Sequence, residues 1–221
     1  MTEEEVFSLL KSRIVHEQQL KKKVFRVGIN GIEGTGKTIF CIKFTAYLIE
    51  SKLDAIHVSI DGFHNKKEIR YKQGRNSAKG YYEDGYSEKD FVEKVLKSSQ
   101  EKIPRYTERI HDLETDEVLN LEPKIIDKNS IIITDGAYLF KPIYKEYWDL
   151  KIYLKTEFNI ALKRGIERDL QQFGHFEHAK EKYEKRYHLA SKIYILENNP
   201  ENEADIIINN SNFENLIIEK Q

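Results

Sequence analysis

The sequence predicts an α/β protein in which helices on two faces enclose a doubly wound, mostly parallel sheet, giving three layers. Short apolar runs alternate with longer segments of helical periodicity, the order that builds right-handed crossovers between parallel strands. The run Ser130–Gly136 begins with consecutive apolar residues, as expected for a strand covered on both faces. A glycine-rich loop at 31–38 lies between a strand-like and a helix-like segment, where sheets of this kind bind ligands.

Length and composition favour one domain, residues 1–221, with enough chain to bury a substantial core. The 36 basic and 37 acidic side chains balance, so we expect no nucleic-acid or membrane partner. A single cysteine, Cys41, and the acidic start of the chain favour a reducing compartment and argue against a signal peptide. We therefore expect a cytoplasmic protein, and the sequence leaves a homo-oligomer open.

In the first half of the chain, residues 1–23 predict an amphipathic helix that Thr2 can cap. A strand is expected at Val24–Asn30, and a helix from the glycine-rich loop to about Ser51. The β-rich run Ala55–Ile60 predicts a second strand, which ends immediately before Asp61.

In the second half, residues 62–87 and 103–122 lack apolar periodicity, and we interpret them as insertions on the acceptor side of the site. The second insertion is expected to form a hairpin-like excursion. A helix should begin after Ser87, and helices at 158–172 and 177–196 should form a lid and the C-terminal helices. The remaining strands are expected at 151–154 and 204–209.

The glycine-rich loop fits the P-loop pattern G-x-x-x-x-G-K-[ST], which cradles phosphates with backbone N–H groups and the N-terminus of the following helix. A nucleoside triphosphate is the natural ligand of such a loop, so ATP is the expected cofactor, with Mg²⁺. Lys37 should reach the β- and γ-phosphates, and the Thr38 hydroxyl should ligate Mg²⁺. The predicted nucleotide-binding residues are those of the loop: Gly31, Glu33, Gly34, Thr35, Gly36, Lys37 and Thr38.

Two strand-terminal carboxylates are candidates for chemistry. Asp135 follows a buried strand, and beside a P-loop it can hold Mg²⁺ with Thr38, although an Asp there can also act only as a turn former. Asp61 can accept the proton of a substrate hydroxyl, with turn chemistry again as the alternative. Arg164 and Arg168 lie four residues apart, so both could close over the phosphates as part of a lid, or simply form a solvated basic face.

Several of these segments resemble the uridine kinase and phosphoribulokinase-like branch of P-loop kinases. They include 28–38, Val58–His64, Arg70–Ser77, Gly80–Tyr82, Thr134–Gly136, Arg164 with Arg168-Asp169, and 204–210. The resemblance implies ATP-dependent phosphorylation of a nucleoside 5′-hydroxyl, with Asp61 as the base. Pro104-x-Tyr106 and His111 reproduce a spacing with which such kinases contact the nucleobase, whereas Thr107 stands where they carry aspartate.

The predicted acceptor-binding residues lie mostly in the two insertions: Asp61, His64, Arg70, Tyr71, Tyr81, Tyr82, Tyr106 and His111. Packing in the core is an alternative role for each tyrosine. Other acceptors compatible with this chemistry are pantothenate, a sugar phosphate or another cofactor precursor. A nucleotide-dependent switch without kinase activity is a further alternative.

Overall fold

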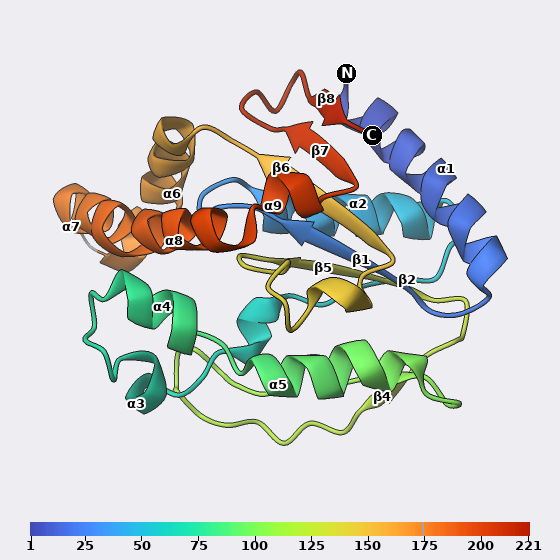
Figure 1. Cartoon of the computed structure of the whole chain (residues 1–221), viewed down its shortest axis with the longest axis horizontal. Coiled ribbons are helices and arrows are strands. Elements are labelled where there is room, and N and C mark those ends of the chain that lie inside the picture. The colour runs from blue at the N-terminus through green and yellow to red at the C-terminus, as the bar shows by residue number, and fades with distance from the viewer. Residues whose placement is uncertain (174) are drawn as a thin grey trace.

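The computed structural model describes residues 1–173 and 175–221, and its centre is a six-stranded sheet (Figure 1). Five strands are parallel, and the sixth, at one edge, is antiparallel. In spatial order they are β2 (Ala55–His57), β5 (Ile131–Gly136), β1 (Phe25–Asn30), β6 (Leu150–Lys155), β7 (Ile206–Asn209) and β8 (Ile217–Lys220). Strands β1 and β5 are neighbours in the middle of the sheet, so the loops after them adjoin.

Apolar clusters lie on both faces of the sheet, which makes three layers. On one face α1 (Glu3–Lys21) and α2 (Lys37–Glu50) contribute Phe7, Leu10, Phe40 and Phe44. The other face packs against α5 (Glu88–Phe91), the π-helical turn Val92–Lys97 that continues it, and α8 (His188–Asn198). The predicted α/β fold, doubly wound and mostly parallel, is confirmed.

The N-terminal helix begins as predicted. Thr2 accepts a hydrogen bond from the Glu5 backbone N–H, and the Glu5 side chain accepts one from the Thr2 N–H, which together form a capping box. The helix ends at Lys21, before Lys22 takes a left-handed backbone conformation.

The predicted strand at 55–60 is too long. Strand β2 ends at His57, and a 3₁₀ helix, Ile60–Phe63, follows. The Ser59 hydroxyl caps this helix by accepting from the Asp61 N–H, a side-chain bond that competes with strand pairing. Asp61 therefore lies on a helical turn beyond the strand instead of at its tip.

The first insertion is more ordered than a loop, because it folds into α3 (Lys67–Arg70) and α4 (Ala78–Asp84). Ser77 caps α4 by accepting from the Gly80 N–H at 2.9 Å. In the second insertion, β3 (Arg105–Tyr106) pairs with β4 (Lys124–Ile125), and His111 bridges to Val118. The hairpin-like excursion at 103–122 is thus present, and its closing strand lies just beyond it.

In the C-terminal half, α6 (Phe158–Phe173), α7 (Phe176–Lys182) and α8 lie together at one end of the sheet, whereas the short α9 (Pro200–Glu203) lies against β6 (Figure 1). The predicted helix at 177–196 is interrupted by a π-helical turn, Tyr183–Tyr187. Strand β8 was not predicted. Among the residues that the structure describes, no helix combines the length and apolar character needed to cross a membrane.

Candidate active site

The glycine-rich loop forms a tight cradle between β1 and α2. Gly34 and Gly36 have φ values of 87° and 94°, which an L side chain rarely adopts. At Gly34 a Cβ atom would also lie 2.1 Å from the Ala161 carbonyl oxygen of α6. Gly36 is the N-cap of α2, so the unpaired N–H groups of that helix open onto the loop.

Lys37 is held inside this loop. Its Nζ lies 3.4 Å from the Ile32 carbonyl oxygen and 3.4 Å from Glu33 Oε2, while Glu33 Oε1 accepts a hydrogen bond from the Tyr81 hydroxyl at 3.0 Å. Burial would raise the pKa of Glu33, but the nearby charges of Lys37 and Arg168 and the Tyr81 bond lower it overall. Glu33 is therefore an anionic partner for the ammonium group.

Thr38, in the first turn of α2, lies next to Asp135, near the end of β5. The Thr38 hydroxyl donates to Asp135 Oδ2 at 2.6 Å, and His57 Nε2–H donates to Asp135 Oδ1 at 2.7 Å. Burial pushes the pKa of Asp135 upward, yet these two bonds and the Lys37 charge hold it below its ordinary value. A hydroxyl and a carboxylate are the hard oxygen donors that Mg²⁺ prefers, so the pair fits this metal.

Cys41 also lies near Asp135 and His57, with ligand atoms of the three within 4.8 Å of one another. Burial raises the pKa of the Cys41 thiol well above its usual range, and the Asp135 charge raises it further. The sulfur is therefore a neutral thiol, a poor ligand for a hard cation.

Asp61 is a solvent-accessible carboxylate at the mouth of the site, and its Oδ1 accepts a hydrogen bond from the Tyr86 hydroxyl at 3.1 Å. Desolvation by the surrounding protein is the main cause of its raised pKa, and the negative charges of Glu33 and Asp135 add to it. His64, whose Nδ1–H donates to the Asp61 carbonyl oxygen at 2.7 Å, has a lowered pKa because it is buried. A carboxylate of raised pKa beside a phosphate loop can take up a proton.

Two cavities meet at Asp61. The larger, of about 400 Å³, extends from Glu33 of the glycine-rich loop towards α3 and the π-helical turn Tyr183–Tyr187. Four predicted acceptor-binding residues other than Asp61 line it: His64, Arg70, Tyr71 and Tyr81. The second cavity, of about 340 Å³, lies between the 3₁₀ helix and the second insertion, and His111 lines it. His111 Nε2 is 3.1 Å from Asp116 Oδ1.

The structure separates the other two predicted acceptor-binding tyrosines from these cavities. Tyr82 is buried in the apolar cluster, its hydroxyl accepts from Asn198, and Lys141 Nζ lies 3.9 Å from its ring centre. Tyr106 is buried in the same cluster, with Lys124 Nζ 6.0 Å from its ring centre. Within residues 1–173 and 175–221, neither tyrosine lines either of the two cavities.

The two arginines of α6 point to different places. Arg168 lines the larger cavity and forms a bidentate pair with Asp169, at 2.7 and 3.0 Å. Arg164 donates to the carbonyl oxygens of Asn210 and Ser211, at 2.8 and 2.9 Å, and stacks on Phe213 with its Cζ 3.6 Å from the ring centre. In this arrangement Arg164 does not share the cavity with Arg168.

Residue-by-residue reading of the sequence missed several groups at the site. His57 ends β2 beside β5, and its role depends on strand order, which the sequence does not state. Phe213 follows β7 and lies against Gly36, where a Cβ atom would be 3.2 Å from its ring. Further residues line the larger cavity from α6, α7 and the π-helical turn Tyr183–Tyr187: Asp169, Lys182 and Arg186. The Arg168-Asp169 pair in the sequence could have indicated that Asp169 belongs to the site.

Comparisons with known proteins agree with this geometry. A curated uridine kinase of Latilactobacillus sakei is 28% identical over 164 residues, covering 70% of this chain and 71% of that protein. Among solved structures, a possible uridine kinase from Bacillus stearothermophilus aligns with a TM-score of 0.65 and 18% identity, covering 90% and 98% of the two chains. A putative fructose transport system kinase from Silicibacter sp. TM1040 aligns with a TM-score of 0.69 and 17% identity, covering 89% and 95%.

At these identities, the two solved structures support the fold alone. The model of the Phosphoribulokinase / Uridine kinase family matches residues 26–216, which include the glycine-rich loop, Asp61, Asp135 and the helices of the C-terminal half. Kinases with a P-loop generally use ATP and Mg²⁺. The chain therefore belongs to the phosphoribulokinase/uridine kinase family and is a P-loop kinase.

Proposed function

We propose that the protein transfers the γ-phosphate of ATP to a hydroxyl group of a nucleoside or a similar small molecule. The observation that carries this proposal is the cavity that Glu33, next to Lys37 in the P-loop, shares with Asp61, a carboxylate that solvent can reach and whose pKa is raised. A cradle for the donor phosphates and a proton acceptor for the hydroxyl thus adjoin the same space.

Each residue has a distinct task in this proposal. The loop N–H groups and Lys37 bind the β- and γ-phosphates, and Lys37 leaves Glu33 to do so. Thr38 and Asp135 would hold Mg²⁺, which when bound supplies positive charge to the phosphate oxygens. Asp61 orients the acceptor hydroxyl and takes its proton as the oxygen attacks the γ-phosphorus. Arg168 stands beside Glu33 and offers a further cation to the charge that develops.

The nucleotide base has a matching place on the other side of the loop. A cavity of about 320 Å³ lies beside Gly36 and is lined by Ile39, Asn210 and Phe213. Asn210 also fixes the loop, because its Nδ2 donates to the Thr35 carbonyl oxygen at 2.8 Å. We propose that the base lies against the exposed Phe213 ring, because aromatic and apolar surfaces are favourable for planar bases.

The direct test is ADP formation from MgATP with a panel of acceptors: uridine, cytidine, pantothenate and sugar phosphates. At least one should be turned over, and Asp61→Asn should lower kcat about 10²- to 10⁴-fold, the range for loss of a general base. Glu93→Gln, at an exposed carboxylate that pairs with Lys97, is the matched control. Full turnover by Asp61→Asn would reject the assigned base.

A further inference from the structure

The large cavity ends in a cluster of basic side chains, Arg70, Arg75, Lys182 and Arg186, which we call the cation cluster. Its arginines surround one aromatic ring: the guanidinium carbons of Arg70, Arg75 and Arg186 lie 5.2, 5.7 and 5.0 Å from the Tyr71 ring centre. Three like charges at such short range repel one another unless an anion lies among them.

None of the three carboxylates that line the same cavity forms an ion pair with the cation cluster among the described residues. Glu33 pairs with Lys37, Asp169 pairs with Arg168, and Asp61 accepts from the Tyr86 hydroxyl. Arg70 reaches Asp116 with one nitrogen, at 3.3 Å. For Arg75, Lys182 and Arg186 no ion pair with a carboxylate is formed within the described parts of the chain, 1–173 and 175–221. Among the described residues, three of the four cations in the cluster therefore have no carboxylate partner.

Two of the arginines are buried with hydrogen-bonding capacity left over. Arg70 and Arg186 are 7% and 3% exposed, and the Nε of each lacks a hydrogen-bond partner among the described residues. A buried, unsatisfied charged donor is costly. The same surroundings lower the pKa of Lys182 to about 8. Desolvation is the larger cause, and the positive charges of Arg186 and Arg75 add to it. An anion bound here would relieve all of these costs.

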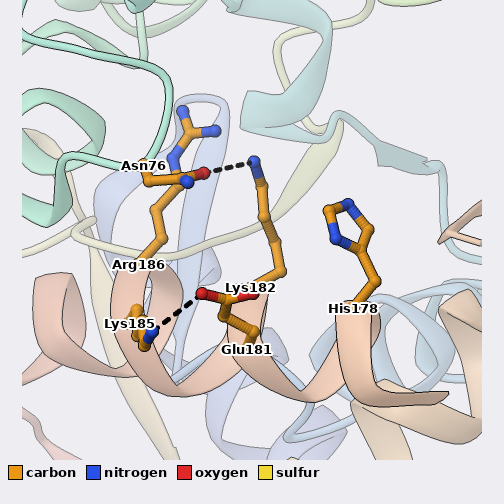
Figure 2. A pocket seen from close by; sticks show the side chains of 6 residues that line it. All are labelled: Asn76, His178, Glu181, Lys182, Lys185 and Arg186. Atoms are coloured by element: carbon orange, nitrogen blue, oxygen red, sulfur yellow. Dashed lines mark hydrogen bonds and ion pairs between the residues drawn. The ribbon is translucent and has the colours of Figure 1, made fainter. Parts of the chain in front are cut away.

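The π-helical turn Tyr183–Tyr187 helps to aim these groups. Lys182 and Arg186 both extend towards Asn76, and Lys182 Nζ is 3.4 Å from Asn76 Oδ1, whereas Lys185 turns aside to pair with Glu181 (Figure 2). Arg186 also stacks on Tyr81, with its guanidinium carbon 4.8 Å from the ring centre. Since Tyr81 bonds to Glu33 of the P-loop, the cluster and the loop are connected through a single side chain.

We propose that the cation cluster binds an anionic oxygen group, a phosphate or a carboxylate, carried by the acceptor whose hydroxyl lies at Asp61. This inference rests on the proposed function and narrows its substrate class from neutral nucleosides to acceptors that already bear an anion. The planar guanidinium group can donate two parallel hydrogen bonds to a pair of oxygens of a phosphate or a carboxylate.

The first test measures binding alone. Inorganic phosphate is titrated into protein saturated with Mg²⁺ and a non-hydrolysable ATP analogue, so that the P-loop is filled, and binding is followed by calorimetry. Phosphate should bind, and Arg75→Ala and Lys182→Met should each weaken binding about tenfold or more, as expected for loss of a charged hydrogen bond. Lys79→Met, at an exposed lysine of α4 that pairs with Glu83, should leave it unchanged.

A second test uses a protein variant in which no ATP analogue is needed to keep phosphate out of the P-loop. In Lys37→Ala protein the P-loop loses its lysine while the cation cluster stays intact, and phosphate should bind there with the same sensitivity to Arg75→Ala. Absence of phosphate binding in both backgrounds, or equal binding by the cluster variants, would overturn the inference.

The catalytic arm uses acceptors that differ by one anionic group: ribose and ribose 5-phosphate, and glycerol and glycerate. Faster turnover of ribose 5-phosphate than of ribose identifies phosphate as the bound group, and faster turnover of glycerate than of glycerol identifies carboxylate.

Two outcomes separate this inference from the kinase proposal. If the protein phosphorylates uridine and Lys182→Met leaves the KM for uridine unaltered, the cluster is not part of the acceptor site, while the kinase proposal stands. Cluster-dependent phosphate binding without turnover of any acceptor would support the anion site and reject the kinase proposal.

Discussion

Asp61 owes its special chemistry to its surroundings and not to its type. An aspartate free in water is ionised at any physiological pH and is a weak base, whereas desolvation by the surrounding protein, together with the charges of Glu33 and Asp135, raises the pKa of Asp61 above its ordinary value of 3.8. The neighbouring His64 shifts in the opposite direction and stays neutral. These two opposed pKa shifts favour the carboxylate over His64 as the proton acceptor in the proposed reaction.

The pH dependence of the reaction should carry this signature. Asp61 can act as a base only when ionised, so kcat/KM should fall as the pH drops through its raised pKa, at a pH above that at which an aspartate free in water titrates. The acid limb should be absent from the residual activity of Asp61→Asn. A rate profile recorded between about pH 4 and 8, near the range in which most proteins are stable, checks this, and an unchanged limb in the variant contradicts it.

We expect His57 to act on the proposed Mg²⁺ site through Asp135. Its Nε2–H bond fixes one carboxylate oxygen and leaves the other towards Thr38. Partners of this kind typically contribute 10- to 100-fold to metal affinity or activity, so His57→Ala should raise the Mg²⁺ concentration for half-maximal activity by about that factor. A Mg²⁺ titration at saturating ATP measures it, with His16→Ala on the exposed side of α1 as control. An unchanged midpoint would leave His57 a purely structural residue.

At the scale of elements, sequence patterns predicted what depends on neighbours along the chain. The capping box of α1, the strands at 25–30 and 131–136 and the P-loop all follow from local spacing. Sequence patterns predicted the wrong secondary structure where a side-chain hydrogen bond or pairing with a distant strand determines it. Ser59 bonds to the Asp61 N–H and turns a predicted strand into a 3₁₀ helix, and β8 depends on pairing with β7 at the sheet edge.

The same reasoning separates the predictable from the unpredictable parts of the site. Lys37 and Thr38 begin α2, which follows β1, and Asp135 lies near the end of the neighbouring strand β5. The P-loop motif and the strand end therefore sufficed to predict that these residues lie side by side. Arg164 and Arg168 share a helix, but their directions are set by the carbonyl groups of the 210–211 turn and by Asp169. Tyr82 and Tyr106 face the core, a choice that aromatic composition alone does not reveal.

Asp149 links three elements at the far end of the sheet. It accepts from the backbone N–H and side chain of Arg26 in β1, at 3.0 and 3.2 Å, and pairs with Lys21 at the end of α1, at 3.0 Å. Burial opposes its ionisation, but Arg26 and Lys21 hold the pKa below 3.8. Asp149→Asn leaves the buried Arg26 unpaired, so the free energy of unfolding at pH 7 should fall by about 3 kcal/mol.

The sign of the pH effect follows from the lowered pKa. The ionised form of Asp149 contributes stability that is present above 3.8 and is lost as the pH falls through the lower folded-state value. The stability difference between Asp149→Asn and the unmodified protein should therefore shrink in acid. Urea unfolding at several pH values checks it. Glu17→Gln, which removes a more exposed helical pair with Arg13, should cost no more than about 0.5 kcal/mol.

Across the whole molecule, the P-loop is fixed by residues from the second half of the chain. His188 Nε2–H donates to the Glu33 carbonyl oxygen at 3.1 Å, and Asn210 donates to the Thr35 carbonyl oxygen. In the strand before the loop, Asn30 donates to the Tyr194 hydroxyl at 2.6 Å. Because α8 carries both His188 and Tyr194, any ligand that orders the loop also acts on this helix.

Nucleotide binding should therefore stabilise the protein and protect a helix remote in sequence. MgATP at about 100 times its Kd should raise the free energy of unfolding by about 2.7 kcal/mol, and amide hydrogen exchange should slow in α8 as well as in residues 31–50. Lys37→Ala should lose most of both effects, because the ammonium group that meets the phosphates is gone. Exchange in the π-helical turn Val92–Lys97, which packs on the other side of the molecule from α2, should not change and serves as the internal control. Protection confined to residues 31–50 would mean that the bonds from His188 and Asn30 do not transmit the ordering of the loop.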